Sequence, residues 1–274
     1  MTAETVLPAA EIPRIGHNEA MVIAAEENDR FQRAIDTING DNWREPTDCT
    51  RWDIRDVVVH VVASAQAQAS PIEFFRQLWQ GRKLTAEIGG VHWVDGLNEG
   101  QLRARTHLTP THLPYLWAST SQRSLKARKA MPRPVRALPI LHLAPRVWKP
   151  LGYLFDIGFT RDVWMHRIDL TRALHQPFPA TADHDRRIVA DIVAEWSTTH
   201  TDPFTLHLTG PAGGVYGRTT EPDGDLVEID AIDCCRILSG RGSPTGVLHH
   251  PLPHDQRTRP NGSTRRNPRP SQER

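Results

Sequence analysis

The sequence predicts a mainly α-helical protein with a small α/β module near its carboxyl end. Apolar residues recur with a period of about 3.6 through the first two-thirds of the 274 residues, as in helices with one buried face. From Phe204 the period changes to about 2, which indicates strands. The last segment is rich in Arg and Pro and has too little apolar surface to order itself. We therefore expect a helical domain at 1–200, an α/β module at 201–250 and a disordered basic tail at 251–274.

The first two helices are predicted from apolar spacing and terminal signals. One covers residues 17–39. The next runs to about Ala69 from a capping box, in which the Thr50 hydroxyl and the Asp53 carboxylate satisfy the first free backbone N–H groups.

The middle of the chain alternates helices with Pro- and Gly-containing breaks. A short helix begins at Ser70-Pro71 and is expected to end at Gly81, before a loop over 82–95. A further helical pattern covers about 96–130, although two prolines interrupt it. The Pro-rich run 131–146 is expected to be a long surface connection.

The strongest helical pattern lies at 151–175, and a shorter one follows at about 183–198. After the strand at Phe204, the alternation at 226–229 predicts another strand, and 230–238 is expected to be helical.

Bulk composition excludes several classes of protein. The 33 Lys and Arg balance 32 Asp and Glu, so no basic field indicates a nucleic-acid partner. The three cysteines, Cys49, Cys234 and Cys235, form no disulfide framework or CxxC motif, which favours a reducing, cytoplasmic setting. Neither a signal peptide nor a membrane-spanning stretch is expected. Cys234 and Cys235 are expected to pack inside the last helix without a chemical role.

The helix at 151–175 carries a candidate site. At about 100° per residue, Asp162, His166 and Asp169 fall on its apolar stripe, where unpaired ionisable groups are costly. The i, i+4 spacing of Asp162 and His166 directs an oxygen and a ring nitrogen at one point, as two ligands of one divalent ion require. Asp169 can then orient His166 through its second ring nitrogen.

Other arrangements are compatible with this spacing. Asp162 can pair with Arg161 or Arg167, and His166 can be a hydrogen-bonded core histidine. His60, in the second helix, is the candidate third ligand. Its angle from the apolar stripe of that helix, roughly 130°, also fits a structural or exposed histidine.

Three runs of residues carry a resemblance to a known family. They are NWREPTDCTRWDIRDVVVHVVASA, DIGFTRDVWMHRIDLTRAL, and FTLHLTGPAGG with the later VEIDAIDCCRILSGR. Together, over about residues 17–245, they resemble the mycothiol-dependent maleylpyruvate isomerase family of the DinB-like superfamily. The resemblance implies an antiparallel four-helix bundle followed by an α/β module similar to sterol carrier proteins. It also implies a divalent metal, with zinc expected, on His60, Asp162 and His166, where Asp162 replaces the Glu of the isomerase.

The same resemblance implies a chemistry. Three protein ligands leave one coordination position open, which is typical of a catalytic zinc site. Mycothiol entering that position would act as a thiolate toward a small electrophilic substrate. In the resembled isomerase it adds to the double bond of maleylpyruvate, permits rotation and leaves. Arg236 and Arg241 are candidates to bind carboxylates of the cofactor or substrate, and Arg241 better matches the family arginine that reaches the metal cleft.

The sequence leaves three functions open. The leading one is a metal- and mycothiol-dependent isomerase or S-transferase, monomeric or homodimeric, acting on small molecules. The second is a protein on the same scaffold that binds a metal or a small apolar ligand without catalysis. The third is a structural bundle in which Asp162 and His166 pair internally.

Overall fold

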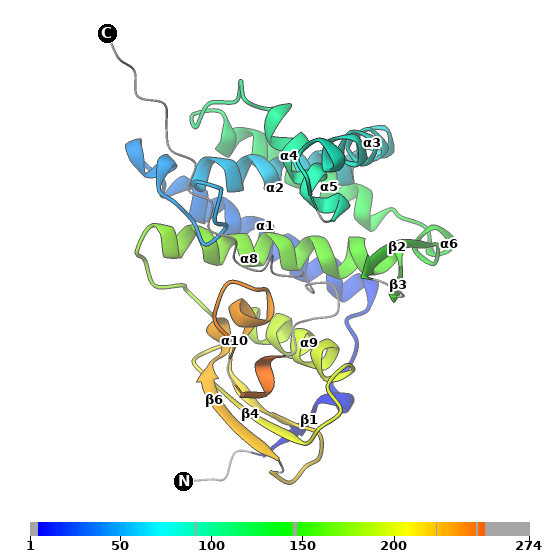
Figure 1. Ribbon diagram of the computed structural model, residues 1–274, viewed down its shortest axis with the longest axis vertical. Helices are drawn as coiled ribbons and strands as arrows, with labels where there is room; N and C mark the ends of the chain where they lie inside the picture. The colour runs from blue at the N-terminus through cyan, green and yellow to red at the C-terminus, as the bar shows by residue number, and fades with distance from the viewer. Residues whose placement is uncertain (1–4, 91, 145–146, 223, 245, 250–274) are drawn as a thin grey trace.

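The computed structural model describes residues 5–90, 92–144, 147–222, 224–244 and 246–249 (Figure 1). The tail predicted to be disordered lies outside these residues. Within them, every helix is too short or too polar to cross a membrane.

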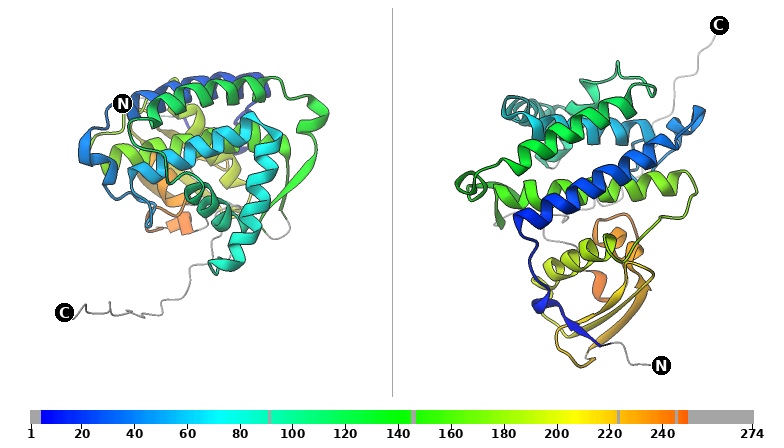
Figure 2. Two further views of the ribbon diagram at one scale, coloured as in Figure 1. Left: turned by 90° about the horizontal axis from the view of Figure 1, so that it is seen from above. Right: turned by 180° about the vertical axis from the view of Figure 1, so that it is seen from behind.

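A four-helix bundle forms the larger part of the structure (Figures 1 and 2). Its members are α1 (His17–Asp36), α2 (Ile54–Ala69), α5 (Leu113–Lys129) and α8 (Phe159–Ala173). Both α1 and α2 pack against α5 and α8, so the four helices enclose one core. That core consists of buried apolar side chains, among them Phe31, Ile35, Val58, Val62, Trp117, Val163 and Leu170.

The bundle mixes antiparallel and parallel neighbours. The pairs α1/α5 and α2/α8 are antiparallel, as expected, whereas α1/α8 and α2/α5 run parallel. For α2 and α5, Arg55 donates to the carbonyl of Leu108, and further along Ser124 donates to Gln68. Parallel neighbours require a crossover connection, which the two helices between α2 and α5 supply.

These two helices, α3 (Pro71–Glu87) and α4 (Trp93–Arg103), pack against each other. The expected helix end at Gly81 is wrong, because α3 continues past it to Glu87. The loop assigned to 82–95 is correspondingly shorter, since α4 already begins at Trp93. A Cβ atom on Gly81 would lie 2.7 Å from Cα of Leu97. The glycine therefore permits a close helix crossing and does not end the helix.

The start of α2 differs from the predicted capping box. Asp53 is the N-cap, and its side chain accepts a 2.8 Å hydrogen bond from the Asp56 amide. Thr50 lies in a turn before the helix and has no part in the cap.

The connection after α5 contains secondary structure of its own. A short helix, α6 (Arg133–Arg136), is followed by the hairpin β2 (Pro139–Ala144) and β3 (Val147–Pro150). Next come α7 (Leu151–Tyr153) and a π-helical turn (Leu154–Gly158) that leads into α8.

This π turn interrupts the helix predicted at 151–175. A π turn holds an additional residue, so the count of about 100° per residue does not carry across it. The candidate residues Asp162, His166 and Asp169 all follow the turn, inside regular α8, and keep their predicted spacing.

The second part of the structure is built on a mixed four-stranded sheet in the order β1-β5-β4-β6. Strands β4 (Phe204–Thr209) and β6 (Asp225–Asp230) match the predicted strands. Between them in the chain comes β5 (Gly214–Gly217), which pairs antiparallel with β4 on the side away from β6. The other edge is β1 (Leu7–Pro8), from the beginning of the chain, so this sheet draws on residues outside 201–250.

Helix α8 lies between two cores. The sheet, α9 (Asp185–Ser197) and α10 (Ala231–Leu238) bury a second apolar cluster against one face of α8. That cluster includes Trp164, Met165, Ile168, Val189, Val193, Trp196, Phe204, Leu206, Cys234 and Cys235. Cys234 and Cys235 thus pack as predicted. Because α8 is buried on almost every side, each polar residue on it requires a partner.

Candidate functional site

The candidate site lies where α2 crosses α8. His60 on α2 and Asp162 and His166 on α8 each offer one ligand atom, and the three atoms lie within 4.8 Å of one another. His60 Nε2 is 3.3 Å from Asp162 Oδ2, and His166 Nε2 is 3.5 Å from Asp162 Oδ1. The antiparallel crossing thus joins an i, i+4 pair to a residue about 100 positions earlier.

The second nitrogen of each imidazole also has a partner. His60 Nδ1 is 2.7 Å from Gln101 Oε1 on α4, and His166 Nδ1 is 2.9 Å from Asp169 Oδ2 on α8. Both Nε2 atoms therefore face Asp162 while both Nδ1 atoms contact oxygens outside the cluster. This is the arrangement that orients metal-ligating histidines.

Aromatic packing covers the two histidines. The ring of Trp52 is centred 5.0 Å from that of His60 and 6.1 Å from that of His166. His60 and His166 are buried, whereas the side chain of Asp162 is 37% exposed. The cluster is accessible from the side of Asp162.

The charges of the site are strongly coupled. Burial raises the pKa of Asp162, but His60 and His166 outweigh it and hold that pKa at about 2. Burial lowers the pKa of His166, but Asp162 and Asp169 outweigh it and raise that pKa to about 10. The pKa of Asp169 lies well below its usual range, because His166 and Arg241 overcome the effect of burial. The site thus presents carboxylates that stay ionised at neutral pH.

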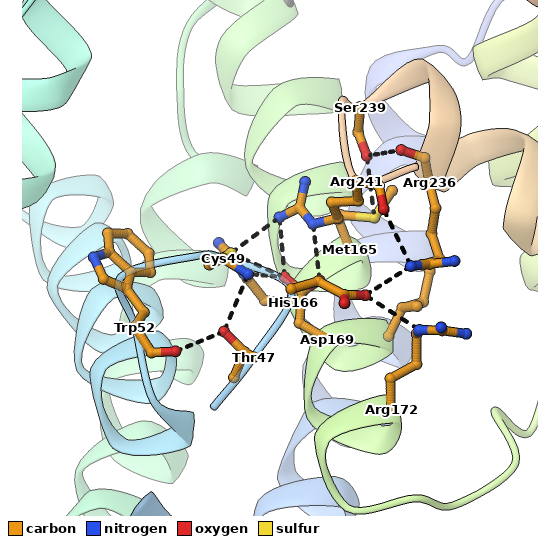
Figure 3. A network of polar contacts seen from close by, with 12 residues as sticks. Thr47, Cys49, Trp52, Met165, His166, Asp169, Arg172, Arg236, Ser239 and Arg241 are labelled. Carbon is orange, nitrogen blue, oxygen red and sulfur yellow. Dashed lines mark hydrogen bonds and ion pairs between the residues drawn. The ribbon is translucent and has the colours of Figure 1, made fainter. Parts of the chain in front are cut away.

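Arg241 reaches the site from the α/β module (Figure 3). Its Nε and Nη2 bind the two oxygens of Asp169 at 2.8 and 2.9 Å, and Nη2 is also 3.6 Å from Cys49 Sγ. Cys49 Sγ is 3.4 Å from Asp169 Oδ2. The chain Arg241–Asp169–His166 therefore connects the module to the candidate ligand.

Arg236 lies on the far side of Arg241 and contacts other groups. It donates to Asp233 at 2.8 Å, to Asp48 at 2.9 Å and to the backbone carbonyl of Arg241 at 3.2 Å. Arg172 binds the same oxygen of Asp48 at 3.1 Å. Arg236 thus supports the backbone that carries Arg241, and its expected role in cofactor binding stays a prediction.

The expected alternative partners of Asp162 are engaged elsewhere. Arg161 binds Asp191 at 2.6 Å and also Glu195, both on α9. Arg167 binds Glu27 and Asp185 at 2.7 Å each. Neither arginine neutralises Asp162.

Three features of the site were not predicted from the sequence: Gln101, Cys49 and the Asp169–Arg241 pair. Gln101 is a polar residue on a half-buried helix, a weak signal in sequence. Cys49 gave no motif, and the partner of Asp169 comes from 72 residues further along the chain.

The donor set fits a divalent ion. In a tetrahedral zinc site with bonds of about 2.0–2.1 Å, neighbouring ligand atoms lie about 3.4 Å apart. His60 Nε2 lies 3.3 Å from Oδ2 of Asp162 and His166 Nε2 lies 3.5 Å from Oδ1, so each nitrogen is near that spacing from one carboxylate oxygen. Two imidazole nitrogens and a carboxylate are also the ligand types that zinc accepts.

The helical bundle, the carboxylate–dihistidine cluster between its helices and the attached α/β module define a class of bundle proteins with a candidate metal centre. The sequence profile of the mycothiol maleylpyruvate isomerase N-terminal domain matches residues 24–171, more than half of the chain. The chain belongs to this family.

Solved structures agree with this assignment at the level of the fold. The chain is similar to the crystal structure of the mycothiol-dependent maleylpyruvate isomerase, with a TM-score of 0.53, and to that of a histidine-to-alanine mutant, with a TM-score of 0.55. Each comparison has 18% sequence identity and covers 86% of this chain and 93% of the other. No curated protein matches this chain in sequence.

Proposed function

We propose that this chain is a metal-dependent enzyme that uses mycothiol as a thiol cofactor and acts on a small electrophilic substrate. The observation that carries the proposal is the convergence of His60, Asp162 and His166, whose ion pairs among the described residues are with one another and with Asp169. Family membership supports mycothiol as the thiol. The free state of the cysteines in the described part of the chain is compatible with a reducing cytoplasm.

Different residues of the site would bind the metal and orient its ligands. His60, Asp162 and His166 would hold a divalent ion, with zinc expected from the ligand types. Such an ion, when bound, lowers the pKa of a thiol at its open position and makes thiolate available near neutral pH. Asp169 orients His166, and the ring of Trp52 keeps water from the buried side of both histidines.

Arg241 would supply the carboxylate contact. In this proposal the α/β module is of the sterol-carrier type and places this guanidinium beside the cluster. A planar guanidinium suits a carboxylate of substrate or cofactor. The reaction is addition of the thiolate to an activated double bond, rotation and elimination of the thiolate, or else S-transfer to the electrophile.

The first test is metal content by plasma mass spectrometry on tag-free protein. We expect about one ion per chain, lost in folded His60→Ala and His166→Ala variants, with circular dichroism as the folding check. Absence of metal after reconstitution with zinc would contradict the proposal.

The second test is thiol turnover by the zinc-loaded protein with mycothiol and maleylpyruvate or other electrophiles. We expect Arg241→Met to lower the rate about 100-fold, as for loss of a charged contact in a transition state. Arg218→Met, at an arginine bonded to the His200 carbonyl, is the control and should retain the rate. Bound metal with no thiol turnover would indicate the non-catalytic binding protein.

A further inference from the structure

A chain of side-chain amides leads from His60 toward the outside of the bundle. Gln101 Oε1 contacts His60 Nδ1 at 2.7 Å, and Gln101 Nε2 contacts Gln77 Oε1 at 2.8 Å. Gln77 Nε2 then contacts the Ala63 carbonyl at 2.9 Å and Glu73 Oε1 at 2.8 Å. The links come from α2, α3 and α4, so they form only in the folded protein.

The contacts of Gln77 with Ala63 and Glu73 determine which group donates in each hydrogen bond of this amide chain. A backbone carbonyl and an ionised carboxylate can only accept hydrogen bonds. Glu73 is held ionised, because the hydrogen bond from Arg76 lowers its pKa to about 2. The Gln77 atom that faces Ala63 and Glu73 must therefore be its NH2 group.

The direction propagates to the histidine. With its NH2 group turned to Ala63 and Glu73, Gln77 presents its oxygen to Gln101. Gln101 must then donate with its NH2 group and present its own oxygen to His60. An amide oxygen only accepts hydrogen bonds, so the Nδ1 atom of His60 must carry a proton.

Burial makes the alternatives costly. Gln77 and Gln101 are each 4% exposed and His60 is 7% exposed, so water cannot readily replace a lost partner. Reversing either amide would place two acceptors or two donors against each other, with an unsatisfied buried group as the result.

We propose that Gln101, held by Gln77, is a positioning residue that fixes the proton of His60 on Nδ1 and so directs Nε2 toward Asp162 as the metal-binding nitrogen. The tautomer follows from the hydrogen-bond geometry, and only its use in metal binding rests on the proposed function. The two histidines would then be oriented by different means, His166 by the carboxylate of Asp169 and His60 by a neutral amide. A neutral amide orients the ring without adding a negative charge to the site.

The test reads the tautomer of His60 directly in metal-free protein. Long-range proton–nitrogen NMR of protein labelled with 15N-histidine distinguishes Nδ1–H from Nε2–H, and the His60→Ala spectrum assigns the signal. We expect a proton on Nδ1 of His60 in the wild type. In Gln101→Leu we expect a shift toward Nε2–H, which can donate to Asp162.

Two further variants separate orientation from packing. Gln101→Glu loses the NH2 group that donates to Gln77 but keeps an acceptor for His60, and it is therefore expected to keep the Nδ1–H tautomer. Gln68→Leu removes a buried amide of α2 that contacts Ser64 and Ser124, away from the site. This control variant should leave the tautomer of His60 unchanged. An Nε2–H wild type, or an unchanged tautomer in folded Gln101→Leu, would overturn the proposal. If Gln101→Leu does not fold, the wild-type and Gln101→Glu spectra still decide it.

Metal affinity gives a second readout. Gln101→Leu should weaken zinc binding 10- to 100-fold, the effect typical of losing the partner of a metal-ligating histidine, and Gln68→Leu should not. Competition with a chromophoric chelator measures the zinc affinity of both variants. A wild type that binds no zinc would end the proposed function but leave the tautomer result standing, so the two failures are distinguishable.

Discussion

Two acid–histidine clusters in this chain contain the same kinds of side chain, but their carboxylates are neutralised in different ways. One is the candidate site of His60, Asp162 and His166. The other is formed by Glu27, His184 and Asp185 between α1, α8 and α9, and its candidate ligand atoms also lie within 4.8 Å of one another. The difference is a buried arginine, Arg167, which pairs with both carboxylates of the second cluster.

Arg167 fills the second cluster. Its guanidinium donates to both oxygens of Glu27, at 2.7 and 3.0 Å, and to Asp185 at 2.7 Å. His184 and Trp164 also contact these carboxylates. We therefore interpret this cluster as a structural ion-pair network in the place where a cation could otherwise bind.

In the candidate site, the ion pairs of Asp162 with described residues are to His60 and His166, and no described arginine or lysine forms one with it. Arg241 binds Asp169, about two helical turns from Asp162. Proximity of acids and histidines is thus insufficient to indicate a metal site, and the deciding feature is a carboxylate that pairs with the candidate ligand histidines and that solvent can reach.

The comparison predicts opposite responses to loss of a histidine. His60→Ala should abolish stoichiometric zinc binding, whereas His184→Ala should retain about one ion per chain, because Arg167 already serves that cluster. Plasma mass spectrometry on folded variants measures this. Loss of zinc in His184→Ala would invalidate the distinction between the clusters.

Removing the resident cation should strongly destabilise the fold. Arg167→Met leaves Glu27 and Asp185 buried without their main partner, and we expect the free energy of unfolding to fall by about 3–5 kcal/mol. Urea denaturation measures it. Arg30→Met is the control, since Arg30 is 3.5 Å from Asp185 at the edge of the cluster and should matter less. A similar loss in both variants would contradict this interpretation.

Asp169→Asn should weaken zinc binding by about 10- to 100-fold, because it removes the carboxylate that orients His166. Competition titration measures the affinity. Asp233→Asn, which removes a half-exposed partner of Arg236 outside the cluster, should leave it unchanged. Equal effects of the two variants would show that the loss is not specific to the site.

Zinc affinity should rise with pH. Asp162 and Asp169 raise the pKa of His166 to about 10, so below that pH a proton must leave before the ring can bind metal. With one proton displaced, we expect up to about tenfold tighter binding per pH unit between pH 7 and 9. Calorimetry in buffers of different ionisation enthalpy counts the released protons. A flat profile would contradict a protonated His166.

The smallest change is expected from Asp162→Glu. The added methylene preserves the oxygen ligand, and Glu is the residue that the resemblance places at this position in the isomerase. We expect zinc affinity to change by less than about tenfold, measured by the same competition. Complete loss of zinc would mean that the helix spacing here accommodates only the shorter side chain.

Local features of the sequence predicted much of this protein. The helices, the change to strands at Phe204 and the i, i+4 pair of Asp162 and His166 all depend on spacings of a few residues. The π turn before α8 does not change the spacing of Asp162 and His166, because both residues follow it. The error at Gly81 arose because a glycine that permits a helix crossing looks in sequence like one that ends a helix.

The rest of the site depends on contacts that no local pattern encodes. The sequence by itself determined which donors stand on one turn of α8, since the helical repeat sets that spacing. Only the tertiary structure decided that Arg161 and Arg167 turn to α9 and α1, that Gln101 contacts His60, and that Arg241 binds Asp169. The physical reason is that partners of buried charges are chosen by the packing of helices far apart in the chain, where each polar group must be satisfied at the same time.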